Sequence, residues 1–143
     1  MHRFSKNQRF FRAVFRIGLA VYAFFIFYTA LLSRVIQGIH FDDPLESLWT
    51  GWGAVEGYGY YLVGNILMFL PLILLLYLSF PKSAGPKPAR RAFLFSALFS
   101  ALIEGAQLVF GIGTFQVSDL VYNTVSGALG GWLYGEIRGR EKS

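Results

Sequence analysis

Four apolar stretches of about 20 residues each constrain this chain more than any other feature. They run over residues 13–33, 60–80, 92–111 and 117–137. A helix that rises about 1.5 Å per residue crosses the roughly 30 Å of bilayer hydrocarbon over such a length. Backbone groups in lipid must be hydrogen-bonded within their own segment. The sequence therefore predicts an all-α fold, an integral membrane bundle of four transmembrane helices in a single domain over 1–143.

The composition excludes several function classes. Charged residues make up 15% of the chain, whereas soluble domains usually contain about 25%, so a soluble enzyme is not expected. The chain has no cysteine, which rules out disulfides, thiol nucleophiles and thiolate metal sites. His2 and His40 are isolated and give no metal-ligand spacing. We expect no metal and no cofactor.

The basic residues are distributed asymmetrically about the apolar stretches. Of the 13 Lys and Arg residues, all but Arg34 lie before or in the first turn of the first stretch, in 81–91 or after the fourth stretch. By the positive-inside rule, both termini and loop 81–91 are cytoplasmic, and loop 34–59 is extracytoplasmic. The net charge of +5 then reflects topology and contact with anionic membrane lipids. Nucleic acid is not an expected partner, because a basic face on a soluble domain is missing.

Two segments need a separate interpretation. The first apolar stretch is longer than a signal-peptide core and no A-x-A-like site follows it, so we expect it to be retained. In loop 34–59, Asp43, Pro44 and Glu46 form a typical helix start. Trp49 and Trp52 follow. A short interfacial helix and an irregular loop with its indoles at head-group depth are both compatible with this pattern.

Polar side chains occur inside three of the four predicted spans. They are Asn65, Glu104, Gln107, Asp119 and Asn123. Counted along the helical rise, Asn65, Glu104 and Asn123 lie at about one level, in the outer third of the membrane, and Asp119 is shallower. Polar residues within lipid usually face the protein interior and often have a function. We predict that they form one ligand-binding site, to which Arg34 contributes from the outer end of the first span.

Helical spacing places these side chains on packing faces. In the third span, a small and polar stripe recurs at intervals of three and four residues: Ala97, Ser100, Glu104, Gln107, Gly111. The opposite side, with Phe95, Leu98, Phe99, Leu102 and Val109, is suited to lipid. In the fourth span, Gly127, Gly131 and Gly135 continue the spacing of Asp119 and Asn123. This doubled G-x-x-x-G predicts close helix packing, within the monomer or across a dimer. Pro71 predicts a kink in the second span, since proline frees a carbonyl there.

Simpler roles are open for several of these residues. Asn65, Gln107 and Asn123 are also suited to interhelical hydrogen bonds, worth about 0.6 kcal/mol each. Asp119 fits the N-terminus of the fourth helix, where the helix dipole favours an anion. Arg34 can reach lipid phosphates or pair with Glu104 or Asp119. Glu104 has no comparable structural explanation, so it is the strongest functional candidate.

Three segments resemble the VanZ-like family of small bacterial membrane proteins. They are GNILMFLPLILLLYL, ALIEGAQLVFGIGTF and SDLVYNTVSGALGGWL. The shared pattern is N-x-x-x-F-x-P, then I-E-x-x-Q, then D-x-x-x-N-x-x-G. The matching positions are Asn65, Phe69, Pro71, Glu104, Gln107, Asp119, Asn123 and Gly127. Relatives often carry an arginine where this chain has Gly113; Arg34 is the residue that could replace it spatially.

The resemblance implies a multi-pass protein of the bacterial plasma membrane. The family is named for an accessory protein of a glycopeptide-resistance cluster linked to teicoplanin resistance. From the polar residues near the outer leaflet, our first hypothesis is a protein that binds a lipoglycopeptide or a lipid-linked cell-wall precursor there. Two alternatives are open: an intramembrane enzyme with Glu104 and Asp119 as acid and base, and a structural subunit. Binding is favoured over catalysis, because the chain lacks a nucleophile triad, phosphate loop or metal set. A homo-oligomer is compatible with all three.

Overall fold

The computed structural model describes residues 6–40, 42 and 58–140, and in these residues the chain is all-α. The helical elements are α1 (Lys6–Phe27), the π-helical turn η1 (Tyr28–Leu32), α2 (Ser33–Ile36), α3 (Tyr58–Ser79), α4 (Pro81–Ala84), α5 (Pro88–Phe110) and α6 (Val117–Arg140). α1, η1 and α2 follow one another without a break, as one long helix. Segment 43–57, which decides between an interfacial helix and an irregular loop, lies outside the described residues.

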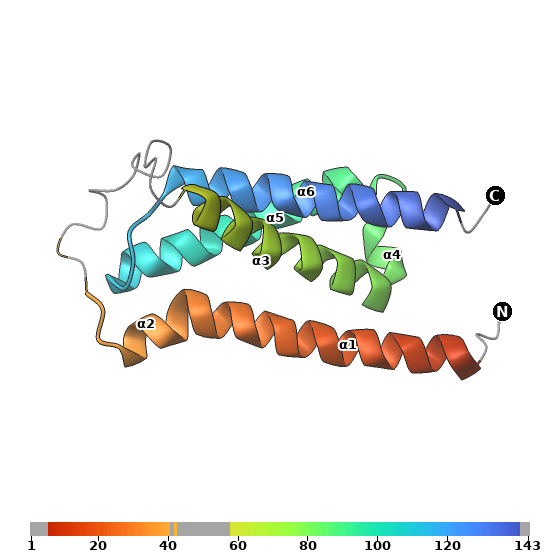
Figure 1. The fold of residues 1–143 in the computed structure, drawn as a ribbon, viewed down its shortest axis with the longest axis horizontal. Helices are drawn as coiled ribbons and strands as arrows, with labels where there is room; N and C mark the ends of the chain where they lie inside the picture. Colours follow the sequence, from red (N-terminus) through yellow and green to blue (C-terminus); the bar gives the residue numbers. More distant parts are fainter. Residues whose placement is uncertain (1–5, 41, 43–57, 141–143) are drawn as a thin grey trace.

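Helices α3, α5 and α6 pack together, and α1 runs along α3 (Figure 1). α1 begins and α6 ends at the same end of the bundle, which we call the terminal end. At the opposite end, the loop end, α5 ends and α6 begins. η1 approaches α5 near the loop end, so the first helix contacts two of its neighbours at different heights.

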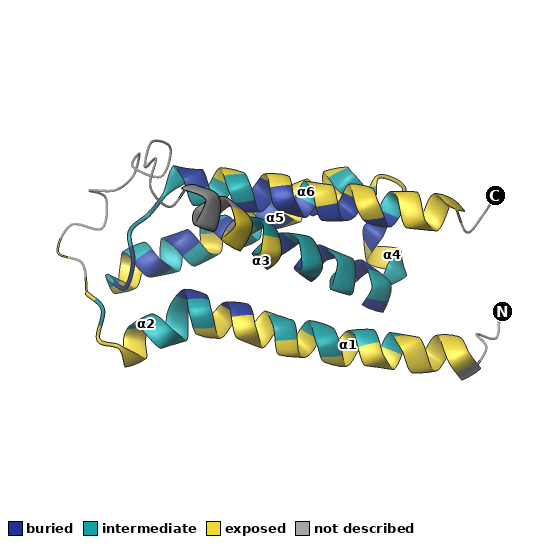
Figure 2. Cartoon of the chain, viewed as in Figure 1, coloured by how far each residue is buried: buried dark blue, intermediate teal, exposed yellow. Residues whose placement is uncertain are grey.

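Two of the described helical segments are long and apolar enough to cross a membrane, Asn7–Ile36 and Pro88–Phe110, and Ile66–Ser79 is a shorter apolar helix. α6 is not among them, which follows from its glycines, Asp119 and Asn123. α1 is exposed along most of its length (Figure 2), and its exposed side chains include Ile17 and Val21. Large apolar side chains on an outer surface are suited to lipid rather than to water.

The helix ends follow local sequence rules. Pro88 opens α5 four residues before the predicted start, because its fixed φ suits the first helical turn. Gly111 ends α5 in the left-handed conformation, with φ at +63°, which only glycine adopts without strain. The Ile112 amide then donates to the Gln107 carbonyl at 3.1 Å. This turn reverses the chain, so that α6 begins beside the end of α5 and packs along it.

The apolar core has two parts. Near the terminal end, Ile73 and Tyr77 of α3 pack with Ala84, Ala92 and Tyr134. Closer to the loop end, Phe69 and Leu72 pack with Ile26 of α1. Phe99 differs from the expectation that it faces lipid. It is half-buried, and its ring centroid lies 6.0 Å from that of Phe69, because α1 and α3 leave room for an aromatic ring there.

Pro71 creates a polar contact between two helices. Proline lacks an amide hydrogen, so the carbonyl of Leu67, four residues earlier, has no partner within α3. The Tyr22 hydroxyl of α1 donates a hydrogen bond to this carbonyl. Neighbouring helices commonly satisfy carbonyls that proline frees in apolar surroundings. Pro71 therefore helps to position the otherwise exposed α1.

Gly127, Gly131 and Gly135 of α6, which we call the glycine ladder, lie against α5, and Gly130 lies against α3. A Cβ added at Gly131 would be 2.6 Å from the Ala92 Cβ and 2.7 Å from the Pro88 carbonyl. A Cβ at Gly127 would overlap Ser96, and one at Gly130 would be 2.8 Å from the Leu70 carbonyl. Backbones approach this closely only where side chains are missing. The ladder therefore packs within the monomer and fixes the faces that α5 and α6 present to each other.

Candidate functional site

The buried face of α5 is polar over most of its length. Its buried residues are Ala92, Ser96, Ser100, Glu104 and Gln107. These positions recur every three or four residues, so they form one stripe on the helix. The α6 glycines contact the part of this stripe nearer the terminal end, at Ala92 and Ser96. The polar residues Ser100, Glu104 and Gln107 follow it towards the loop end.

Glu104 is 3% exposed, although a carboxylate is costly to remove from water. One of its oxygens, Oε2, accepts a hydrogen bond of 2.9 Å from the backbone amide of Gln116. Arg34 and Asp119 are its electrostatic neighbours, one of opposite charge and one of like charge. The α5–α6 turn supplies the amide donor, and α2 and α6 supply the two charges. Glu104 is therefore the point where three parts of the chain meet.

Gln107 connects α5 to the first helix. Its Nε2 donates a hydrogen bond of 2.9 Å to the Ala30 carbonyl, in the middle of η1. Gln107 is 5% exposed and Ala30 is also buried. A π-helical turn within a longer helix often marks a functional site. Here the π-helical turn is where the polar side chain of Gln107 on α5 binds the backbone of the first helix.

Asn123 lies on α6 opposite Ser100 of α5. Its Nδ2 donates a hydrogen bond of 2.9 Å to the Ser100 hydroxyl. Its Oδ1 is buried and has no hydrogen-bond partner among the described residues. An unsatisfied buried acceptor costs about 1–3 kcal/mol, so this oxygen is a site for a donor. The neighbouring Ser126 instead donates to the Ile66 carbonyl at 3.0 Å and attaches α6 to α3.

Arg34 approaches the turn between α5 and α6. Its Nη1 donates to the Ile112 carbonyl at 3.4 Å, and its side chain is half-buried. A Cβ added at Gly113 would be 2.8 Å from Arg34 Nη1 and equally far from Gln107 Oε1. The guanidinium therefore lies directly beside Gly113, a small residue that leaves room for it.

The structure brings most of the sequence-predicted site residues into one region, which we call the polar cluster. Its members are Arg34, Ser100, Glu104, Gln107, Gln116, Asp119 and Asn123. Asp119 lies in the first turn of α6, half-buried. Asn65 belongs to α3, and its side chain lies outside the described part of the structure. Pro71 and the α6 glycines lie deeper in the bundle and act in packing rather than at the cluster.

Sequence reasoning missed two features of the polar cluster. The Gln116 contact uses a backbone amide, which every residue except proline has, so no side-chain pattern could predict it. The π-helical turn occurs in the segment YTALL, whose sequence pattern does not differ from that of an ordinary apolar α-helix. Thr29 and Ser33 are the one local signal. Their hydroxyls donate to the Phe25 and Thr29 carbonyls, as happens where a helix ladder is perturbed.

A small apolar groove lies beside the cluster. It has a volume of about 150 Å³ and lies between the first helix and α5. Its lining residues are Ile26, Phe27, Ala30, Leu31, Phe99, Leu102 and Ile103. Ala30 is one of the residues that line the groove, and its carbonyl accepts the hydrogen bond from Gln107. The groove and the polar cluster therefore share a wall.

The chemistry of the cluster is that of a polar binding site. It offers two carboxylates, one guanidinium, amides and a free carbonyl-type acceptor at Asn123. Within the residues that the structure describes, no group of three His, Asp or Glu side chains could hold a metal ion. Carboxylate and amide oxygens accept hydrogen bonds from N–H and O–H donors, and the groove beside them is lined by apolar residues.

Comparisons with known proteins agree with this architecture. Residues 10–138 match the model of the family described as VanZ/LLP1. The chain is also 38% identical over 74 residues to "Protein VanZ" of Enterococcus faecium. That similarity covers 52% of this chain and 44% of the relative, so the chain spans less than half the length of the curated protein it matches. No solved structure matches.

Proposed function

The chain belongs to the VanZ/LLP1 family and is a VanZ-like membrane protein, and from this premise we propose that its polar cluster binds an amphipathic envelope ligand. The ligand is a lipoglycopeptide such as teicoplanin or a lipid-linked cell-wall precursor. Both have a head group rich in amide and hydroxyl donors and an apolar tail. The observation that carries the proposal is the shared wall between the polar cluster and the 150 Å³ groove, at Ala30.

The polar half of the ligand would replace missing hydrogen bonds. Asn123 Oδ1 has no partner among the described residues, and Glu104 uses one oxygen for Gln116. Head-group donors would satisfy these acceptors, and Arg34 would hold an acceptor of the ligand. In this chain the guanidinium is that of Arg34 on α2, which lies beside Gly113, the position where relatives often carry an arginine. The groove would hold part of the tail, where each buried methylene contributes about 0.8 kcal/mol.

We place the cluster in the outer half of the bacterial plasma membrane, with both termini in the cytoplasm. The support is the charge distribution: Arg12, Arg16, Lys82 and Arg138 all lie at the terminal end of the bundle. Basic residues remain on the cytoplasmic side in most membrane proteins. In this orientation the loop end, with the polar cluster, faces outward. Membrane lipids surround α1, and a homo-oligomer is compatible with its exposed side.

The experiment that tests this function is antibiotic susceptibility in a sensitive Gram-positive host. Cells expressing the wild-type protein are compared with cells expressing Glu104→Gln at matched membrane abundance. Teicoplanin is compared with vancomycin, which lacks the acyl tail. We expect protection from teicoplanin that Glu104→Gln removes and that Glu136→Gln, the same change at an exposed site of α6, retains. Equal susceptibility with and without the wild-type protein contradicts the resistance function.

Two other outcomes separate the alternatives. Turnover of a lipid-linked substrate by the wild-type protein, lost in both Glu104→Gln and Asp119→Asn, supports an intramembrane enzyme that uses these carboxylates as acid and base. A loss of folded protein in Glu104→Gln, with unchanged function per molecule, supports a structural subunit.

A further inference from the structure

A second polar region lies at the terminal end, far from the polar cluster. A cavity of about 460 Å³ is lined by Arg12, Arg16, Ser79, Phe80, Pro81, Lys82 and Arg138. An adjoining cavity of about 580 Å³, between α4 and α6, shares Pro81, Lys82 and Arg138 with it. Three different helices, α1, α4 and α6, therefore supply cations to this basic recess, which we define as the two cavities together.

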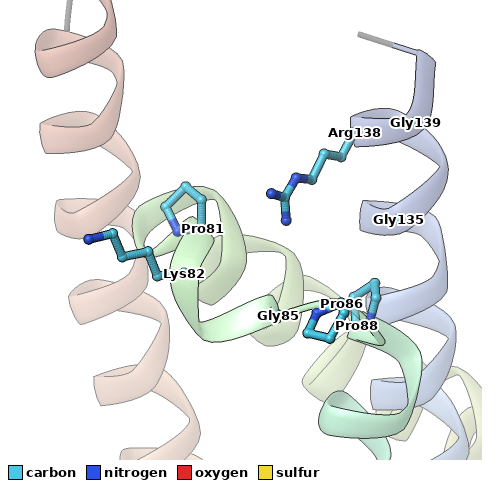
Figure 3. Close-up of a pocket in the computed structure, with 8 residues that line it drawn as sticks. All are labelled: Pro81, Lys82, Gly85, Pro86, Pro88, Gly135, Arg138 and Gly139. Atoms are coloured by element: carbon cyan, nitrogen blue, oxygen red, sulfur yellow. The ribbon is translucent and has the colours of Figure 1, made fainter. Parts of the chain in front are cut away.

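Arg138 and Lys82 approach from different helices and extend in different directions. Figure 3 shows the Arg138 guanidinium extending from α6 over α4, and Lys82 extending from α4 towards α1. The Arg16 guanidinium carbon lies 4.9 Å from the centre of the Phe80 ring, so the ring helps to hold this cation in place. Among the described residues, no carboxylate lines either cavity.

Ser79 provides an independent observation. It is 1% exposed, and its hydroxyl has no hydrogen-bond partner among the described residues. Buried hydroxyls are nearly always hydrogen-bonded, and an orphan suggests an occupant that the protein chain does not provide. Because Ser79 lines the same cavity as Arg16, Lys82 and Arg138, that occupant would be negatively charged and would accept hydrogen bonds.

We propose that this basic recess binds a phosphate group, and that the group is the head of an anionic membrane lipid. Phosphate oxygens accept charge-assisted hydrogen bonds from arginine and lysine and can accept one from a hydroxyl. The recess lies where apolar α1 and α3 reach the end of the bundle, which is the level of lipid head groups.

Native mass spectrometry with titrated lipid tests this proposal. The purified full-length protein, in a neutral detergent, is titrated with phosphatidylglycerol, phosphatidylcholine or inorganic phosphate. We expect one tightly held phosphatidylglycerol, retained at least tenfold better than phosphatidylcholine. Arg138→Gln should weaken its retention about tenfold, the loss of one charge-assisted bond. Ser79→Ala should weaken it about fivefold, the loss of one neutral bond.

The matched control is Arg90→Gln, which removes the same charge from an exposed residue of α5 that lines neither cavity. Retention equal to that of the wild type in Arg90→Gln supports a built site. An equal loss in Arg90→Gln and Arg138→Gln overturns the proposal in favour of general attraction to a basic surface. Equal retention of the two lipids also overturns it. Inorganic phosphate that displaces the lipid at millimolar concentration supports the phosphate site with a soluble source.

Circular dichroism and size-exclusion profiles of each variant separate binding from folding. If Arg138→Gln does not fold, Lys82→Gln provides the same test, since Lys82 is an exposed residue of the short helix α4 and lines both cavities. Unchanged retention in a folded Lys82→Gln, Arg138→Gln double variant would contradict the proposal.

Discussion

Individual polar atoms connect the helices of this protein at sites where the backbone or a side chain lacks its usual partner. Pro71 leaves the Leu67 carbonyl without an amide, and the Tyr22 hydroxyl takes that place. Gln107 similarly donates to the Ala30 carbonyl within a π-helical turn. In an apolar environment such bonds decide how helices are placed relative to one another, because the hydrophobic effect between helices in lipid is weak.

At the residue scale, Tyr22→Phe tests the contact with Leu67. The variant leaves the Leu67 carbonyl, which Pro71 deprives of its amide donor, without a partner in apolar surroundings, so we expect the free energy of unfolding to fall by about 1 kcal/mol. Thermal unfolding in detergent measures the change. Tyr28→Phe removes a hydroxyl from a 42% exposed tyrosine of the adjoining turn and serves as the control. Equal stability of Tyr22→Phe and the wild type would show that the bond does not hold α1.

A second prediction at the residue scale concerns Gly113. A methyl group there would meet Arg34 Nη1 and Gln107 Oε1, which can move away, and the Gln107 Cβ at 3.0 Å, which requires a shift of a few tenths of an ångström. We expect Gly113→Ala to keep the fold, since these groups yield easily, but to weaken ligand retention about tenfold by displacing the guanidinium. Ligand titration measures the effect, with Gly105→Ala as control, because a Cβ at Gly105 meets nothing within 4 Å. Equal weakening in both variants would argue against a role for Arg34.

At the element scale, α6 is defined by its glycines rather than by its hydropathy. The helix has few of the large apolar side chains that make α1 and α5 recognisable as membrane spans. It gains its contacts from the close approach of Gly127 and Gly131 to α5 and of Gly130 to α3. This packing places Asn123 against Ser100 and orients the first turn of α6 towards Glu104.

The packing of the α6 glycines predicts that two glycine-to-alanine substitutions change the free energy of unfolding in opposite directions. Alanine normally stabilises a helix relative to glycine by about 0.5–1 kcal/mol. Gly139→Ala should show this gain, because a Cβ there meets nothing within 4 Å. Gly131→Ala should instead destabilise by about 1–3 kcal/mol, because its Cβ would meet Ala92 and the Pro88 carbonyl at 2.7 Å or less. Thermal unfolding of the two variants decides the point. A gain in both would mean that α6 does not pack closely on α5.

The sequence predicts elements better than it predicts contacts. Apolar length predicted the helices, and the spacing of Ser100, Glu104 and Gln107 predicted a polar face that the structure buries. The π-helical turn, the Gln116 amide and the half-buried Phe99 were not predicted. These features depend on contacts between helices that are distant in the sequence and on backbone groups. Neither kind of interaction produces a recognisable pattern of residues.

At the scale of the whole molecule, the two ends differ in chemistry. The loop end contains the buried carboxylate Glu104 and buried side-chain amides, and the terminal end contains the basic recess. An apolar core with two clusters separates them. This polarity matches a protein that faces two different aqueous compartments. On our proposals, one end recognises an envelope ligand and the other holds an anionic lipid that keeps the bundle at a fixed depth.

The orientation can be tested cleanly because the chain has no cysteine. Gln37→Cys lies at the loop end and Ser83→Cys at the terminal end, and both positions are exposed. We expect a membrane-impermeant maleimide to label Gln37→Cys in intact cells and Ser83→Cys only after the membrane is opened. The reverse pattern would place the polar cluster towards the cytoplasm, since the two ends would exchange sides.

Binding of teicoplanin to the purified protein in lipid nanodiscs tests the central claim most directly. The wild type, Glu104→Gln and Glu136→Gln are titrated in parallel, and their folded fractions are matched beforehand. The polar cluster predicts saturable binding that Glu104→Gln weakens at least tenfold, because a charge-assisted bond is lost, and that Glu136→Gln leaves unchanged. Saturable binding of equal strength in all three proteins would contradict the claim that the ligand is held at the polar cluster.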